Sequence, residues 1–94
     1  MSLQEIRSQI DQVDEAILAL FLERMRLAEQ VAQVKKDKRL PVYNAEREQE
    51  ILMWATDRSG ELADYSRQFF ASMFELSRKR QMEILQLSET CQED

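Results

Sequence analysis

Histidine is absent from this chain of 94 residues, and cysteine, glycine and proline occur once each. The chain therefore lacks the ligands of a Cys/His zinc site and any imidazole for acid–base catalysis, and we expect neither metal nor cofactor. A single cysteine, Cys91, cannot form an internal disulfide, so the sequence does not point to an oxidising compartment. No apolar run reaches the roughly 20 residues of a membrane span, and the first residues lack an apolar signal core. We therefore expect a cytoplasmic protein.

Negative charge is in excess, with 18 acidic against 13 basic residues and a net charge of −5. An acidic surface of this kind argues against nucleic acid or an anionic membrane as a partner. It leaves room for a local cationic pocket. The length predicts a single domain over residues 1–94 with a small core of its own.

The two strong helix breakers, Pro41 and Gly60, divide the chain into three segments with helical periodicity. The pattern predicts an all-α fold of three helices, one long at the N-terminus and two shorter. The first begins after Ser2 as N-cap and ends before Pro41. Its seam, spaced alternately by four and three residues, is Ile6, Ile10, Val13, Ile17, Leu20, position 24, Leu27, Val31 and Val34, and it is apolar at every position except 24.

The second helix is predicted to begin after Asn44 as N-cap and to end near Asp57. Arg58, Ser59 and Gly60 then form a break, and the third helix extends from about Leu62 to Leu87. Residues 88–94 are polar and acidic, and we expect them to form a frayed tail.

The length of the first helix predicts a homodimer. About 36 residues at 1.5 Å each give a rod of about 54 Å. A compact chain of this size has a radius of gyration of only about 12 Å. Two shorter helices cannot cover the whole apolar seam, and a symmetric, intertwined dimer is the simplest way to bury it.

Polar residues stand at positions of apolar phase in all three predicted helices. Burying such groups without partners is costly. Interhelical ion pairs explain any one of them, but three cations against one carboxylate leave an excess of positive charge. A small anion with more than one carboxylate would neutralise that excess. The residues are Arg24, Lys35, Arg47, Glu48, Ser77 and Gln81.

Arg7 precedes Arg24 by 17 residues, which places it about 25 Å away along the same helix. It cannot serve the same pocket within one chain, although the partner's Arg7 could do so in an antiparallel dimer. Spacing alone favours a solvated surface arginine.

The run from Arg7 through Gln81 resembles the all-helical chorismate mutases. The helix-one motifs of that family are matched by Arg7, Asp11, Asp14, Arg24 and Ala28. The most recognisable segments are IRSQIDQVDEAILALFLERMRLAEQVAQVK and PVYNAEREQEIL. The resemblance implies an interlocked six-helix homodimer with two shared active sites, each completed by the partner's Arg7.

The same resemblance implies conversion of chorismate to prephenate, by an intramolecular [3,3] rearrangement, in phenylalanine and tyrosine biosynthesis. Arg24 and the partner's Arg7 would hold the substrate carboxylates, with Arg47 closing on the outer part of the substrate. Lys35 and Gln81 would donate hydrogen bonds to the ether oxygen.

Three further positions follow from the resemblance. Glu48 would accept from the ring hydroxyl, and Ser77 would lie near a carboxylate. Asn44 stands where several relatives carry Asp, and we expect this difference to affect binding modestly.

Two alternatives remain open. The chain also resembles the isochorismate–pyruvate lyases, which share the scaffold and the cations. The resemblance to that subfamily implies an apolar residue at the position of Glu48, so a glutamate here favours the mutase. In a non-catalytic helical dimerisation or regulatory module, the seam cations would merely be paired.

Overall fold

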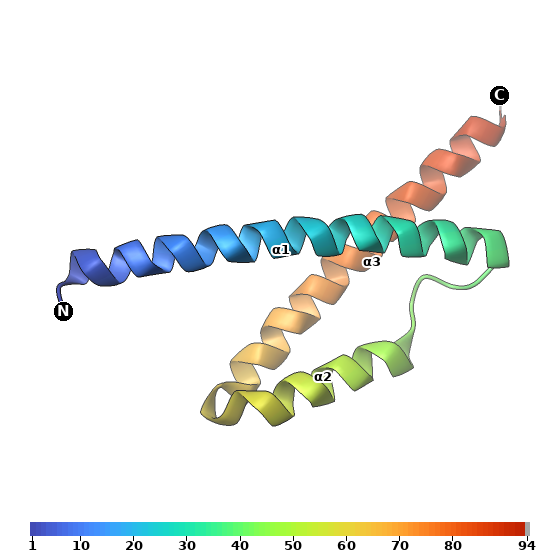
Figure 1. The fold of residues 1–94 in the computed structure, drawn as a ribbon. Helices are drawn as coiled ribbons and strands as arrows, with labels where there is room; N and C mark the ends of the chain where they lie inside the picture. The colour runs from blue at the N-terminus through green and yellow to red at the C-terminus, as the bar shows by residue number, and fades with distance from the viewer. Residues whose placement is uncertain (94) are drawn as a thin grey trace.

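The computed structural model describes the backbone of residues 1–93 and the side chains of residues 1–86. The described part is all-helical, as predicted (Figure 1). Its elements are α1 (Leu3–Lys38), α2 (Ala45–Ser59), the short 3₁₀-helix η1 (Gly60–Leu62) and α3 (Ala63–Glu93). No helix among the described residues is long and apolar enough to cross a membrane.

Local hydrogen bonds explain where α1 begins and ends. The Oγ atom of Ser2 accepts from the backbone N–H of Glu5 at 3.1 Å, which is the predicted N-cap. Arg39 adopts a left-handed conformation, with φ of 56°. The backbone N–H of Leu40 then donates to the carbonyl of Lys35 at 2.7 Å. Pro41 follows and cannot continue the helix.

The bounds of α2 and α3 differ from those predicted. Asn44 caps α2, and its Oδ1 accepts from the backbone N–H of Arg47 at 3.1 Å, as predicted. However, α2 continues through Ser59, and the break is reduced to η1 beginning at Gly60. The third helix extends past the predicted end at Leu87 because no glycine or proline follows to stop it. A frayed tail is expected at residues 88–94. The side chains of this segment, and Asp94 as a whole, lie outside the described residues.

α3 is the shared packing surface of the chain. It packs against both α1 and α2, whereas the backbones of α1 and α2 stay more than 8 Å apart, Cα to Cα, in the described part. In Figure 1, α1 crosses α3 at an angle, and the N-terminal end of α1 extends past the other helices. The buried apolar core is correspondingly small: Ala28, Ala32, Ala55, Met73 and Phe74.

The chain is elongated, with a radius of gyration of 17.1 Å and extents of 60 × 27 × 14 Å. This radius exceeds the roughly 12 Å of a compact chain of equal length. The apolar seam of α1 stays largely uncovered, from Ile6 at 40% exposed to Leu20 at 64% exposed. Runs of exposed apolar side chains on this scale are typical of interaction surfaces.

Gly60 occupies a backbone conformation that suits only glycine, with φ of 54° and ψ of −125°. A Cβ there would meet no atom within 4 Å, so backbone strain alone opposes a side chain. We predict that Gly60→Ala lowers the free energy of unfolding by about 1–3 kcal/mol. Urea unfolding at one fixed protein concentration measures the change. Ala45→Gly, at an exposed position of α2, serves as a control for general helix effects. An unchanged free energy of unfolding in Gly60→Ala would contradict the predicted backbone strain.

Candidate active site

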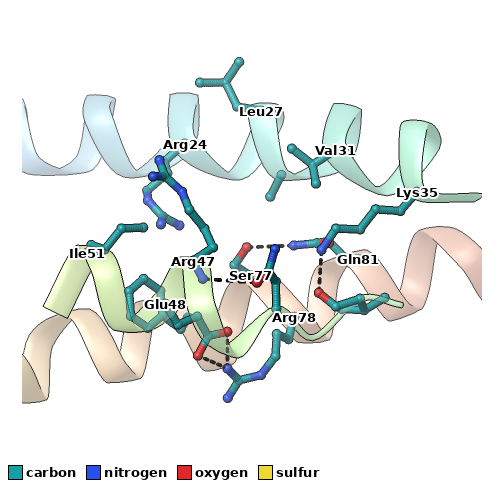
Figure 2. A pocket seen from close by; sticks show the side chains of 14 residues that line it. Arg24, Leu27, Val31, Lys35, Arg47, Glu48, Ile51, Ser77, Arg78 and Gln81 are labelled. Carbon is teal, nitrogen blue, oxygen red and sulfur yellow. Dashed lines mark hydrogen bonds and ion pairs between the residues drawn. The ribbon is translucent and has the colours of Figure 1, made fainter. Parts of the chain in front are cut away.

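One pocket of about 300 Å³ lies where α1, α2, α3 and the loop between α1 and α2 approach one another (Figure 2). Its apolar wall is formed chiefly by α1 and by Ile51 and Phe74. Its polar lining residues are Arg24, Lys35, Asn44, Arg47, Glu48, Ser77, Arg78 and Gln81.

The structure brings together seven of the eight residues that the sequence predicts at the site. They come from three helices and one N-cap. Arg7 is the exception, because it is exposed on the N-terminal half of α1. Its 17-residue separation from Arg24 corresponds to about 25 Å along the helix. One chain by itself therefore does not bring Arg7 to this pocket.

Arg24 is half-buried and lies over the ring of Phe74, with its guanidinium carbon 5.7 Å from the ring centroid. Burial lowers the pKa of Arg24, and the charge of Arg47 lowers it further, while Glu48 partly offsets both. Two guanidinium groups thus approach the same space from α1 and α2. Their repulsion favours an anion between them.

The remaining cations of α1 and α2 make weaker contacts. The Nζ atom of Lys35 donates to the backbone carbonyl of Val42 in the connecting loop, at 2.5 Å. Arg47 pairs with Glu50 at 3.2 Å, and both side chains are two-thirds exposed. An exposed pair of this kind contributes little to stability, so Arg47 exchanges partners at small cost.

Ser77 and Gln81 are buried polar residues on the inner face of α3, at 8% and 6% exposed. The Nε2 atom of Gln81 donates to the Oγ atom of Ser77 at 3.1 Å. The buried Oε1 atom of Gln81 has no hydrogen-bond partner among the described residues. Rotating the amide by half a turn would let Oε1 accept from the Ser77 hydroxyl and turn the N–H donors to the pocket.

Arg78 is a pocket residue that the sequence analysis missed. Both carboxylate oxygens of Glu48 accept hydrogen bonds from its Nη1 atom, which joins α2 to α3. The sequence carried a signal for it. Arg78 lies four residues after Phe74 and three before Gln81, which predicts that all three lie on the same side of the helix. The pattern indicated the neighbouring Ser77 and Gln81 more strongly, because these two polar residues interrupt the apolar face of the helix.

Positive charge is in excess in this pocket. Four cationic side chains, including Arg78, line it against the single carboxylate of Glu48 in the described part of the chain. Guanidinium and ammonium groups bind carboxylates through charge-assisted hydrogen bonds. The pocket is therefore suited to a small anion carrying two carboxylates. Among the described residues, no cluster of three His, Cys, Asp or Glu side chains could hold a metal ion.

Comparisons with known proteins agree with this chemistry. Residues 6–82 match the profile of the family "Chorismate mutase type II". The chain is 45% identical over 49 residues to a chorismate mutase of Methanocaldococcus jannaschii, covering 52% of this chain and 50% of that protein. It is also 45% identical over 49 residues to a bifunctional chorismate mutase/prephenate dehydratase of Aquifex aeolicus, covering 52% of this chain and 14% of that protein. This chain thus spans half or less of these curated relatives.

A solved structure has the same arrangement of helices. It is a conserved hypothetical protein from Pyrococcus furiosus, with a TM-score of 0.69 and 30% sequence identity. The likeness covers 84% of this chain and 93% of the other. The match thus extends over most of both chains.

The buried Oε1 atom of Gln81, which has no hydrogen-bond partner among the described residues, indicates that the site lowers the stability of the fold. A buried polar atom without a hydrogen bond costs free energy, and leucine has nearly the same size as glutamine without that atom. We predict that Gln81→Leu raises the free energy of unfolding by about 1 kcal/mol. Urea unfolding beside the wild type at equal concentration checks this, with Gln68→Leu, at an exposed position of the same helix, as the control. A marked loss of stability would show instead that the amide is satisfied in the assembled protein.

Proposed function

The chain belongs to the chorismate mutase type II family, and on that premise we propose that it converts chorismate to prephenate, a step in phenylalanine and tyrosine biosynthesis. The observation that carries this proposal is the single pocket in which seven predicted residues meet with an excess of cations. The cytoplasmic location expected from the sequence stays a prediction.

The chemistry suits a chain without histidine. The rearrangement is intramolecular and needs no nucleophile, metal or proton transfer. The protein has two tasks, namely to hold a flexible dicarboxylate in its reactive chair conformation and to stabilise the negative charge that develops on the ether oxygen. Both tasks require positioned hydrogen-bond donors and cations, which this pocket provides.

Arg24 and Arg47 are suited to hold the substrate carboxylates. Arg24 is half-buried and supported by the ring of Phe74, so its guanidinium is already oriented. Arg47 is exposed and paired with Glu50, and it closes over the outer part of the substrate by exchanging that partner. Ser77 of α3 lines the same pocket and would lie near a carboxylate.

Lys35 and Gln81 are suited to stabilise the ether oxygen. They approach the pocket from α1 and α3, and each has a polar partner that the substrate would replace or reorient. Lys35 exchanges the Val42 carbonyl for the ether oxygen. Gln81 turns its amide so that Ser77 becomes the donor to Oε1. Two donors that act where charge develops favour the transition state over the bound substrate.

Glu48 and Asn44 complete the binding set. Glu48 is the pocket carboxylate and is suited to accept a hydrogen bond from the ring hydroxyl of the substrate. The side chain of Asn44 is occupied as the cap of α2, so its effect on binding is indirect and modest.

The proposal includes an interlocked six-helix homodimer with shared active sites. The uncovered apolar seam of α1 supports it, since a second copy would bury that seam. The position of Arg7 supports it as well, because an antiparallel α1 would bring the partner's Arg7 to the pocket of the first chain. Each active site would then contain residues from both chains.

The proposed function is tested by the loss of the ultraviolet absorbance of chorismate. We predict turnover by the wild type and a decrease in kcat of roughly 10²–10³-fold in Lys35→Ala, because one transition-state donor is removed. Lys36→Ala is the matched control, since this neighbouring lysine does not line the pocket. Pyruvate release from isochorismate in place of chorismate turnover would identify a lyase. Inactivity on both substrates by an intact dimer would favour a binding or regulatory module.

The shared site predicts complementation between two inactive variants. Arg7→Ala and Arg24→Ala damage the same site from opposite chains, so a mixed dimer contains one intact site and one doubly damaged site. Mixing the two variants after unfolding and refolding should restore about a quarter of the wild-type rate, because half of the dimers are mixed. Arg24→Ala mixed with Lys35→Ala is the control and should stay inactive. A rate no higher than the sum of the separate variants would contradict the shared site.

A further inference from the structure

Glu48 does not pair with the cations at the centre of its own pocket. A single carboxylate among Arg24, Lys35 and Arg47 is expected to pair with one of them, because no other acidic side chain is among the described residues that line the pocket. The structure shows a different pairing, in which both oxygens of Glu48 accept from the Nη1 atom of Arg78. In Figure 2 this pair lies on the side of the pocket away from α1.

We infer that Arg78 is a positioning residue, which holds the carboxylate of Glu48 away from Arg24 and Arg47 and so keeps these two cations available for the substrate carboxylates. This inference rests on the proposed function. It adds a second role for the ion pair beyond joining α2 to α3. It also explains how a pocket with an internal carboxylate remains receptive to a dianion.

Arg78 is itself well oriented for this task. Its guanidinium carbon lies 5.2 Å from the ring centroid of Tyr43, in the loop between α1 and α2. The side chains of Arg78 and Glu48 are 32% and 21% exposed, so water screens their attraction only partly. The hydrogen bond to Glu48 raises the pKa of Arg78 despite partial burial. The guanidinium is therefore held between a carboxylate and an aromatic ring.

Loss of Arg78 would release Glu48 toward the pocket cations. The charge of Glu48 already acts on Arg24, whose guanidinium approaches the same space. A freed carboxylate would compete with the substrate for Arg24 or Arg47 as an internal anion. Competition of this kind weakens the binding of the substrate and the transition state alike, so KM increases and kcat is largely unchanged.

The first experiment compares three substitutions at Arg78 by steady-state kinetics with chorismate. Arg78→Met should raise KM about tenfold and change kcat less than twofold. Arg78→Lys should restore KM to within about threefold of wild type, because one nitrogen serves both oxygens of Glu48 and an ammonium can replace it. Arg78→Gln, which keeps a donor without the charge, should lie between them and provides a second test if Arg78→Met folds poorly.

Arg80→Met is the matched control. Arg80 lies two residues away on α3 and pairs with Glu29 of α1 at 3.0 Å, with both side chains about as exposed as the pocket pair. It does not line the pocket. Arg80→Met therefore removes a comparable interhelical ion pair and should leave KM unchanged. An equal rise of KM in both variants would overturn the inference, because it would reflect a general loosening of the helices.

A double-mutant cycle with Glu48→Gln separates positioning from direct contact. If Arg78 acts through Glu48, Arg78→Met should raise KM less than twofold in the Glu48→Gln background. A tenfold rise in that background would mean that Arg78 binds the substrate itself, and it would overturn the inference. Wild-type turnover without any effect of Arg78→Met would overturn the inference and leave the proposed function standing. Absence of wild-type turnover would instead overturn both.

Discussion

The constraint on which the rest of the structure depends is the uninterrupted length of α1. Its 36 residues form a rod that α3 crosses at one place, and the C-terminal half carries Arg24 and Lys35 to the pocket. The N-terminal half carries an apolar seam that α2 and α3 leave largely uncovered. One helix thus provides both a wall of the site and a surface that a second copy would cover. Under the proposed dimer, these two tasks depend on the same apolar seam.

α3 performs the complementary task at the crossing. It packs against both other α-helices, and its buried Met73 and Phe74 anchor the small core. Ser77, Arg78 and Gln81 follow within two turns of that anchor and face the pocket. Core packing and polar lining are therefore neighbours on one helix. The position of the site depends on the same contacts that hold the helices together.

Electrostatics give the pocket its chemical character. Burial and, after it, the nearby charge of Arg47 lower the pKa of Arg24, and the buried Oε1 atom of Gln81 has no hydrogen-bond partner among the described residues. Both features cost folding free energy, and both would be offset when a dianion binds or the amide turns toward a ligand. The ion pair between Glu48 and Arg78 removes the internal carboxylate from this competition. The pocket is thus organised for a ligand that carries the negative charge.

The sequence by itself determined the helical class, both N-caps and the direction of six polar residues toward one pocket, because these depend on local hydrogen bonds and on helical periodicity. It placed the end of α2 slightly early, because the last residue of a helix is poorly specified even where Gly60 follows, and it placed the end of α3 early because neither glycine nor proline follows Leu87. The partner of Glu48 was decided by tertiary structure alone. Glu48 and Arg78 are 30 residues apart, and no periodicity within one helix indicates which cation on another helix a carboxylate will meet. That choice depends on how α2 and α3 pack, which brings Arg78 and not Arg24 or Arg47 into hydrogen-bonding distance.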